Sequence, residues 1–491
     1  MLFLMAISLY TSRVILNALG VEDFGIYNVV GGFVVMFSMI SNSLSSAISR
    51  FITYEIGKGN LESLKNIFSS SVTIQFLLSI IIFIIAELCG FWFINAKMNI
   101  PVEKVYAANW VLQFSILTFI TNLISVPYNA VIIAHEKMSA FAYISIIEAV
   151  GKLSIAYLVV ISPFNRLIFY SILMCLVAII VRVIYGYYCR KHFLECKYTF
   201  IWNKKLLSNI FSFAGWSFIG AAAGVLRDQG VNLVINVFCG PAVNAARGIA
   251  VQVNTAINSF TQNFMTALNP QITKSCAAGN YDYMLDLVYK GSRISFYLLL
   301  ILALPIIMNA DFILKLWLQN VPEYAISFVR LILVLALCDS VTYSLVTAML
   351  ATGRIKRYQI IVGSLNLLNL PFSYVALYFN FSPISTLYIA IGISLICLIA
   401  RLILLKSMLH LSIKYYCKSV IFNVLMISMI AFPMAFFIKS LFVLNTFNNL
   451  LLILADLLIA FSCITYIGLK KAERDKAKEI IKKRLKKYIL H

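Results

Sequence analysis

The sequence contains few charged residues. Only 12% of its 491 residues are Asp, Glu, Lys or Arg, whereas 62% are hydrophobic. A soluble domain has roughly 25% charged residues, so the composition excludes an ordinary soluble enzyme. One transmembrane helix takes about 20 apolar residues, so this length accommodates about a dozen spans and no large soluble domain. Uninterrupted apolar runs at 76–86 and 298–308 do not alternate as barrel strands do, and the predicted fold class is an all-α integral membrane protein.

Motifs for metal, disulfide and nucleotide chemistry are also missing. The ten cysteines include no Cys-x-x-Cys pair, and the four histidines form no cluster. We therefore interpret the cysteines as small packing residues and predict no metal site. No Gly-x-x-x-x-Gly-Lys-Ser/Thr motif occurs, which excludes a P-loop on this chain. The first residues are apolar without a basic segment or cleavage site, so we predict no signal peptide.

Acidic residues are half as common as basic ones, 19 against 40, which gives a net charge of +21. In a soluble protein this excess would suggest a nucleic-acid partner, but in a membrane protein it reports orientation. With both termini in the cytoplasm, the expected outside loops contain only five cations, which are Lys97, Lys104, Arg166, Lys315 and Lys439. We therefore predict a multi-pass protein with both termini cytoplasmic and no nucleic-acid partner.

Apolar windows bounded by charge, Gly or Pro predict about 14 transmembrane helices. Their limits are 1–19, 26–49, 66–94, 105–134, 138–162, 166–189, 208–238, 243–269, 286–309, 325–351, 358–379, 385–405, 420–439 and 448–468. A shift of 220 residues aligns Gly20 with Gly240 and Gly59 with Gly279, and segment 134–137 resembles 351–354. Spans one to six then correspond to spans seven to twelve in the same orientation. This predicts two parallel-repeat six-helix lobes around a central cavity, plus an appended C-terminal helix pair.

The predicted organisation follows from these spans. It comprises an N-terminal six-helix lobe at 1–189, a cytoplasmic linker at 190–207, a C-terminal six-helix lobe at 208–405, two extra transmembrane helices at 406–468, and a basic amphipathic cytoplasmic tail at 469–491. The outside loops are too short to hold the acids, bases and acceptor of an integral glycan polymerase or ligase. We therefore predict that the chain is not an enzyme.

Ionisable residues inside the bilayer are expensive unless they are paired or face a cavity. Arg13 has no acid in its own span, so it either lines the cavity or pairs with an acid such as Glu87 or Asp228. Arg227 and Asp228 point in different directions on a regular helix, so each is expected to need its own partner, and both are cavity candidates. Glu87 and Asp339 are candidates either for ion coupling or for pairing with these cations.

Polar residues recur on one face of the eighth predicted span. Arg247 begins this span and is followed by Asn254, Asn258 and Gln262 at intervals of seven, four and four residues, which keeps them on one helical face. At the repeat-equivalent place in span two stand Ser38 and Asn42. These two stripes either form a wet substrate surface or hold helices together through hydrogen bonds.

Three segments carry a resemblance to a known family. They are residues 8–32 with Arg13, Asn17, Gly20 and Gly32, residues 54–60 (Tyr-Glu-Ile-Gly-Lys-Gly-Asn), and residues 126–130 (Val-Pro-Tyr-Asn-Ala). They resemble the polysaccharide-type flippases, which translocate O-antigen and other lipid-linked oligosaccharides. These flippases share the multidrug/oligosaccharidyl-lipid/polysaccharide exporter superfamily with multidrug and toxin extrusion transporters. The resemblance covers essentially the whole chain and is strongest over its first 140 residues.

The resemblance implies flipping of an undecaprenyl-diphosphate-linked oligosaccharide across the bacterial inner membrane by alternating access. Arginines would compensate the anionic diphosphate. The alternative is a multidrug or cation antiporter, for which the resemblance implies a carboxylate in the first span, and 1–19 contains none. Expected partners are the anionic lipid-linked oligosaccharide, membrane lipids, a polysaccharide polymerase and glycosyltransferases. We expect no cofactor, and either a proton or sodium gradient or downstream glycan consumption as the energy source.

Overall fold

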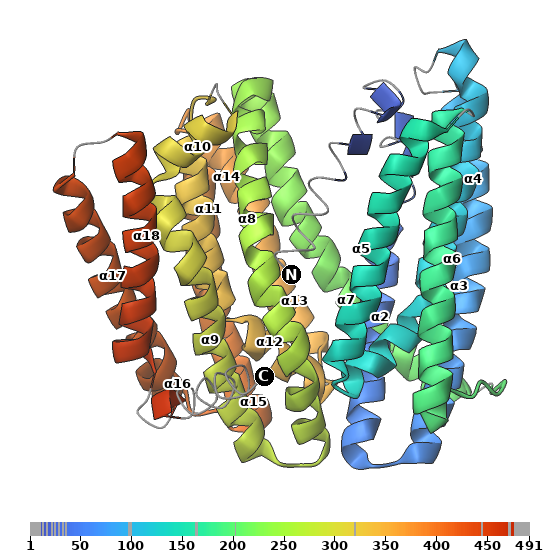
Figure 1. Ribbon diagram of the computed structural model, residues 1–491. Helices are drawn as coiled ribbons and strands as arrows, with labels where there is room; N and C mark the ends of the chain where they lie inside the picture. The colour runs from blue at the N-terminus through green and yellow to red at the C-terminus, as the bar shows by residue number, and fades with distance from the viewer. Residues whose placement is uncertain are drawn as a thin grey trace, which may run out of the picture. The chain divides into compact units, whose positions relative to one another are not determined.

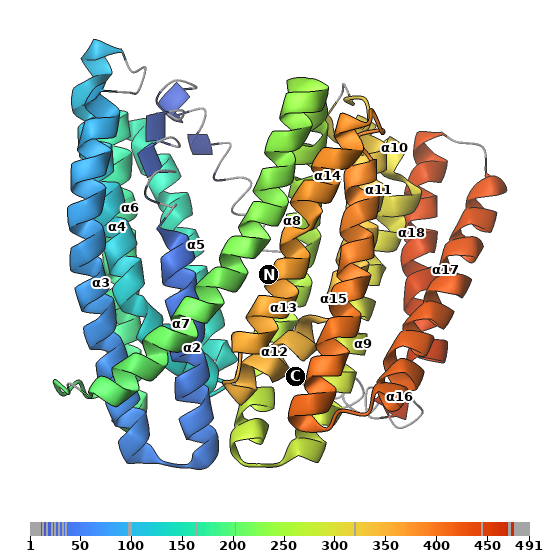
Figure 2. The same ribbon diagram turned by 180° about the vertical axis from the view of Figure 1, so that it is seen from behind.

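Helices account for all regular structure in the described part of the chain (Figures 1 and 2). The computed structural model describes residues 11, 14–15, 18–20, 23, 26–27, 30–31, 34, 37–96, 101–162, 165–201, 203–318, 321–442, 445–469 and 473–475. No strand occurs within these ranges, which confirms the predicted all-α fold class. The chain packs as two units. Unit 1 comprises Met1–Ala221 with Thr273–Gly279, and unit 2 comprises Ala222–Ile272 with Asn280–His491.

Helix α4 (Val102–Ala134) is central to unit 1, because it packs against four other helices of that unit. These are α2 (Ser38–Lys58), α3 (Leu61–Ala96), α5 (Met138–Ile161) and α6 (Arg166–His192). Its inner face is aliphatic, and Ala108, Val111 and Leu112 are at most 1% exposed. A 3-10 turn, η1 (Leu194–Cys196), follows α6, and α7 (Lys204–Val225) leads from unit 1 into unit 2.

Helix α9 (Tyr281–Met308) is the central helix of unit 2. It packs against α11 (Ala325–Ser340), α12 (Tyr343–Thr352), α17 (Phe422–Ser440) and α18 (Thr446–Cys463). The remaining elements are η2 (Leu226–Gly230), α8 (Val231–Ala277), α10 (Ala310–Leu318), α13 (Lys356–Leu367), α14 (Asn369–Tyr378), α15 (Ser385–Leu409), α16 (Ile413–Tyr416), η3 (Cys417–Ile421) and η4 (Ile464–Gly468). Helix α15 packs against α11, α13 and α14, so a second helical layer lies beside α9 and α11 (Figure 2).

Ten helices in the described residues are long and apolar enough to cross a membrane. An eleventh span is formed if α11 and α12, which are bent by 41° at their junction, cross together. These helices coincide with eleven of the predicted spans. Predicted span 1–19 falls mostly outside the described residues, and 26–49 is described without gaps only from residue 37. Predicted span 243–269 lies in α8, whose amide and arginine side chains lower its mean hydropathy.

Left-handed backbone conformations recur at positions that the internal repeat aligns. Gly20 and Gly240 both have φ of 80°, and Gly59 and Gly279 have φ of 73° and 74°. Positive φ is accessible to glycine at little cost because it has no Cβ. The aligned glycines therefore share the same backbone conformation, as the predicted repeat requires.

Two further details follow the same repeat. Glu136, with φ of 58°, is aligned with Gly353, with φ of 75°, so one copy keeps the left-handed turn without glycine. Asn60 and Asn280 each accept a hydrogen bond from a backbone N–H three residues later, at 3.0 Å and 3.2 Å. Both asparagines therefore begin the next helix with the same side-chain cap.

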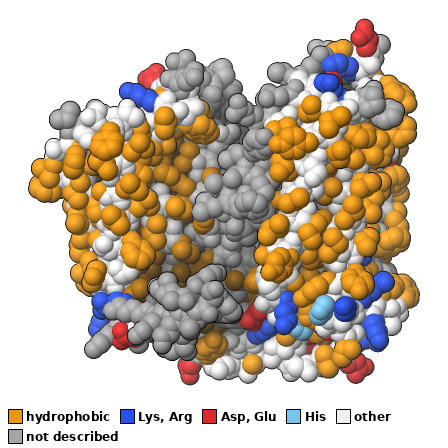
Figure 3. Space-filling model, in the orientation of Figure 1, with side chains coloured by type: hydrophobic (Ala, Val, Ile, Leu, Met, Phe, Trp, Pro, Cys, Tyr) orange, Lys and Arg blue, Asp and Glu red, His pale blue; other side chains and the backbone are white. Residues whose placement is uncertain are grey.

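The flanks of the helices carry mainly hydrophobic side chains, whereas Lys, Arg, Asp and Glu gather at the helix ends (Figure 3). Exposed apolar residues such as Val183, Met429 and Leu458 lie on these flanks, at 62%, 75% and 67% exposure. Such a surface would be unfavourable in water but suits the hydrocarbon core of a bilayer. The chain is therefore a multi-pass membrane protein.

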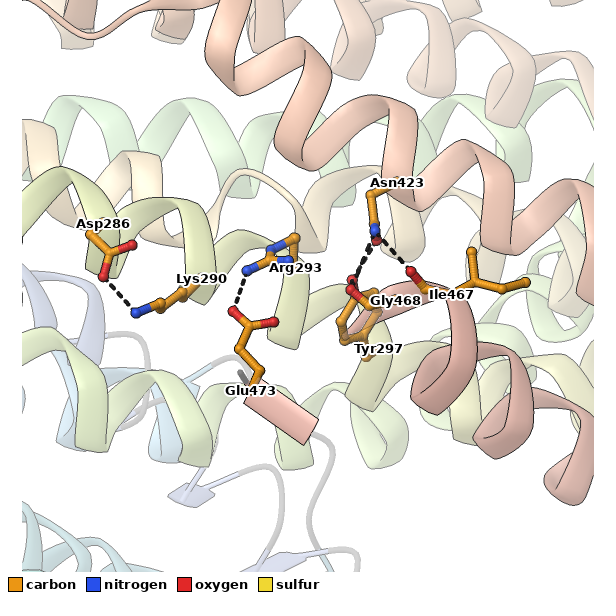
Figure 4. A network of polar contacts seen from close by, with 8 residues as sticks. All are labelled: Asp286, Lys290, Arg293, Tyr297, Asn423, Ile467, Gly468 and Glu473. Atoms are coloured by element: carbon orange, nitrogen blue, oxygen red, sulfur yellow. Dashed lines mark hydrogen bonds and ion pairs between the residues drawn. The ribbon is translucent and has the colours of Figure 1, made fainter. Parts of the chain in front are cut away.

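Helices α17 and α18, which follow the repeat, are attached to α9 by packing and polar contacts (Figure 4). The Tyr297 hydroxyl on α9 donates a hydrogen bond to the Gly468 carbonyl at 3.0 Å. One turn earlier, Arg293 Nη2 pairs with Glu473 at 2.6 Å. The appended helix pair and the segment after it thus join unit 2, and tail residues 476–491 lie outside the described residues.

Candidate functional site

The predicted site residues are divided between the two units. Those in unit 2 are Arg227, Asp228, Arg247, Asn254, Asn258, Gln262 and Asp339. Ser38, Asn42 and Glu87 belong to unit 1. Arg13 lies outside the described residues, so its role stays a prediction.

Arg227 and Asp228 stand in η2, a π-helical turn between α7 and α8. Arg227 Nε donates to Asp228 Oδ1 at 3.0 Å, so the two neighbours pair with each other. The expectation that each needs its own partner was therefore wrong. It assumed that neighbouring side chains on a helix point too far apart to meet, whereas the long arginine side chain reaches the carboxylate of the next residue. Single π-turns within α-helices occur frequently at functional sites.

Further polar residues surround this pair inside unit 2. Arg227 Nη1 donates to Asn366 Oδ1 on α13 at 3.3 Å, and Arg227 also attracts Asp339 on α11 electrostatically. The Ser394 hydroxyl on α15 donates to Asp339 Oδ1 at 2.5 Å. We call these five residues, which come from η2, α11, α13 and α15, the Arg–Asp cluster. Asp339 therefore has a cation nearby, and its role in ion coupling stays a prediction.

Arg247 is a buried cation of unit 2 whose hydrogen bonds are incomplete. It lies on α8 beyond Gly240, where φ of 80° and ψ of 174° interrupt the helix. The residue is 6% exposed, and neither Nε nor Nη1 has a hydrogen-bond partner among the described residues. Asp228 attracts it and Arg227 repels it at longer range. A buried guanidinium without acceptors costs several kcal/mol, so this position favours an anion or ordered water.

The polar stripe of α8 is partly satisfied by its own neighbours. Asn258 Nδ2 donates to Asn254 Oδ1 at 2.7 Å, and the Tyr343 hydroxyl donates to Asn258 Oδ1 at 3.0 Å. Asn258 therefore helps to attach α12 to α8, as expected for a residue that joins helices. Gln262 is exposed, so its amide is the most accessible part of the stripe.

The candidates of unit 1 lie on different helices. On α2, Asn42 is exposed and Ser38 is half-buried, so the Asn42 amide is open to a ligand. On α3, Glu87 Oε2 accepts a hydrogen bond from Gln113 Nε2 of α4 at 2.7 Å, while its Oε1 is buried without a partner among the described residues. Glu87 therefore has one amide partner, and its Oε1 could accept one more hydrogen bond.

A cavity of about 370 Å³ in unit 1 was not predicted from the sequence. Its polar lining comes from Tyr27, Ser115, Thr118, Asn122 and Ser171. Ser115, Thr118 and Asn122 recur at intervals of three and four residues on α4, so their spacing carries the signal that could have revealed it. We find no group of three His, Cys, Asp or Glu side chains able to hold a metal ion in the part of the chain that the structure describes.

Comparison with known proteins defines the class. The family model described as "Polysaccharide biosynthesis protein" matches residues 2–276, and the MatE model matches residues 217–375. A MATE crystal structure in complex with MaD3S superimposes with a TM-score of 0.70 at 14% identity, over 83% of this chain and 94% of that one. A MOP superfamily transporter from Pyrococcus furiosus superimposes with a TM-score of 0.66 at 14% identity, over 82% and 93%. The protein thus has the fold of the MATE transporters.

The match to the polysaccharide biosynthesis model covers more than half of the chain. The chain therefore belongs to the polysaccharide biosynthesis protein family, and family and fold together place it among membrane transporters. The uncharacterized membrane protein EpsK of Bacillus subtilis (strain 168) is 20% identical over 304 residues, which are 61% of this chain. The chain spans 59% of the length of that relative.

Proposed function

We propose that the protein translocates an anionic, undecaprenyl-diphosphate-linked oligosaccharide across the bacterial inner membrane for assembly of a surface polysaccharide such as O-antigen. The observation that carries this proposal is Arg247, a 6% exposed residue whose Nε and Nη1 lack acceptors among the described residues. Membership of the polysaccharide biosynthesis family supports the same class of cargo. Translocation would proceed by alternating access, with both termini in the cytoplasm.

A diphosphate would complete the hydrogen bonds of Arg247. Charge-assisted hydrogen bonds from guanidinium to phosphate oxygens are short and contribute about 1.5–3 kcal/mol each. Arg227 already donates to Asp228 and Asn366, so it would contribute mainly through long-range electrostatic attraction to the diphosphate. Arg247 is therefore the primary phosphate ligand of unit 2 in this proposal, and Arg13 is the predicted second ligand.

Sugar hydroxyls require neutral donors and acceptors. In unit 2 the exposed Gln262 amide, which also hydrogen-bonds the Tyr343 hydroxyl, would supply both, while Asn254 and Asn258 are already joined by a hydrogen bond. In unit 1 the exposed Asn42 and the half-buried Ser38 would contribute in the same way. Neutral contacts of this kind bind a glycan without adding charge to the path.

Arg247→Gln is the direct test. In a strain that lacks the native gene, we expect at least a tenfold loss of surface glycan at equal membrane protein level, because a diphosphate loses its charge-assisted partner. The matched control is Arg401→Gln on α15, another membrane arginine whose buried Nε has no partner among the described residues. Normal glycan output from Arg247→Gln would overturn the proposal, as would an equal loss in both variants.

Drug or cation antiport is the second candidate. The MatE match to residues 217–375 and the 60% exposed Asp228 carboxylate favour it, because a cationic substrate needs an accessible acid. Under this alternative, Asp228→Asn should raise drug susceptibility and leave surface glycan unchanged. A deletion strain that changes only in glycan chain length would instead indicate a polymerase or ligase.

Energy for transport is proposed to come from a proton or sodium gradient, with Asp339 and Glu87 as the coupling acids, or from downstream glycan consumption. Asp339 interacts with Arg227, so binding of a cation at Asp339 would change the field in the Arg–Asp cluster. If flipping in proteoliposomes depends on neither the proton nor the sodium gradient, the ion-gradient proposal is excluded. A polysaccharide polymerase and glycosyltransferases are the proposed protein partners.

A further inference from the structure

A groove of about 590 Å³ runs along unit 1 between α4 and α6. It is separate from the polar cavity of that unit, with which it shares no lining residue. Helix α4 contributes Thr121 and Ile124, and α6 contributes the remaining lining residues, which are Ile179, Arg182, Val183, Gly186, Tyr187 and Arg190. The groove thus joins an apolar part to a part with two arginines, and the proposed function uses none of these residues.

The apolar part of the groove belongs to the lipid-facing flank. Ile179, Val183 and Tyr187 are 44%, 62% and 69% exposed, although their side chains are large and hydrophobic or aromatic. The flanks of this unit are largely hydrophobic, with Lys, Arg and His side chains gathered at its lower end in Figure 3. This part of the groove is therefore suited to contact with an acyl chain.

The basic part of the groove presents two arginines whose charges are not neutralised. In the described part of the chain, neither Arg182 nor Arg190 has a carboxylate within 4.0 Å. Arg190 is exposed, and the Arg182 guanidinium lies 4.0 Å from the ring centroid of Tyr128. The aromatic ring fixes the Arg182 side chain without cancelling its charge.

Gly186 brings the two arginines closer together. A Cβ at Gly186 would lie 2.8 Å from Arg182 Nη1, so the guanidinium occupies the space that a side chain at 186 would take. Arg182 thus extends along α6 toward Arg190, and only about one helical turn, roughly 6 Å of rise, separates Gly186 from Arg190. Both guanidinium groups can therefore reach a single headgroup.

We propose that this groove binds an anionic phospholipid of the surrounding bilayer. Its phosphodiester would accept hydrogen bonds from Arg182 and Arg190, and one acyl chain would lie along Ile179 and Val183. Basic sites between transmembrane helices near the cytoplasmic surface bind anionic headgroups by this combination of charge and apolar contact. The lipid is a resident of the groove and not the transported cargo, so this inference goes beyond the proposed function.

The test measures lipid retention on the purified full-length protein by native mass spectrometry. Phosphatidylglycerol and phosphatidylcholine of equal chain length are added at equal concentrations. We expect at least a tenfold preference for phosphatidylglycerol in the wild type, and a preference below about twofold in Arg182→Gln/Arg190→Gln, because two charge-assisted contacts are lost. The control, Lys65→Gln/Lys137→Gln, removes the same charge from unit 1 outside the groove and should keep the wild-type preference.

A second variant changes the groove without removing charge. Gly186→Leu keeps both arginines but fills the space of the Arg182 guanidinium, and it should also lower retention of phosphatidylglycerol. Equal loss in the lysine control would indicate general electrostatic attraction and overturn the site. Displacement by millimolar inorganic phosphate, or stronger retention of an isoprenoid diphosphate than of phosphatidylglycerol, would overturn the assignment to a bilayer phospholipid.

Discussion

Glu473→Gln should weaken the attachment of the segment after α18 to α9. Glu473 pairs with Arg293 Nη2 at 2.6 Å, and the two side chains are 22% and 5% exposed. The substitution keeps the shape of the side chain but removes the counter-ion of a nearly buried guanidinium. Breaking a buried ion pair from one side costs about 3–5 kcal/mol. Because Glu473 keeps some contact with solvent, we expect about 2–4 kcal/mol here.

Asp286→Asn provides a matched control on the same helix. Asp286 and Lys290 also pair at 2.6 Å, but their side chains are 48% and 45% exposed (Figure 4). An exposed pair contributes about 0–1 kcal/mol, so its loss should hardly change the unfolding midpoint. The assay is thermal unfolding of both variants in detergent, together with limited proteolysis near residue 473. Equal midpoints and equal cleavage in the two variants would refute the reasoning that burial decides the energy of these pairs.

Three further predictions concern helix ends and the core. Burial raises the pKa of Glu195, but the 2.5 Å hydrogen bond with His135, a backbone hydrogen bond and the attraction of His135 together outweigh burial and hold the pKa below the ordinary 4.5. The charged carboxylate therefore stabilises the protein above pH 4.5, and this contribution is lost in more acidic solution, where the unfolding midpoints of wild type and Glu195→Gln should converge. Gly57→Val places a Cβ 2.7 Å from the backbone of Lys274, so we expect a lower midpoint, and an unchanged midpoint would contradict the close contact of α2 with the end of α8. Tyr416→Phe removes a buried hydroxyl that hydrogen-bonds partners at 3.0 Å and 3.1 Å, and chemical unfolding should show a loss of about 1–3 kcal/mol.

Local sequence patterns were sufficient for the helices and for the repeat. Within a bilayer, a long apolar segment satisfies its backbone hydrogen bonds by forming a helix. Apolar length alone therefore predicts most spans. The aligned glycines at 20, 59, 240 and 279 carried the repeat because positive φ restricts the residue type at those positions. The Asn60 and Asn280 caps agree with it because capping depends only on residues three positions apart.

The hydrogen-bond and ion-pair partners of the polar residues could not be predicted from local sequence patterns. Arg227 and Asp228 were each expected to need a partner of their own, but they pair with each other, and the other acceptor of Arg227, Asn366, is 139 residues away. Asn258 was a candidate either for a substrate surface or for joining helices, and it joins α8 to α12 because Tyr343, 85 residues later, donates a hydrogen bond to its oxygen. The sequence thus determined the membrane fold, the repeat and the places where polar residues enter the bilayer, because each depends on near neighbours. Only the tertiary structure decided that Arg247 lacks an acceptor among the described residues, because hydrogen-bond partners come from helices that are distant in the chain.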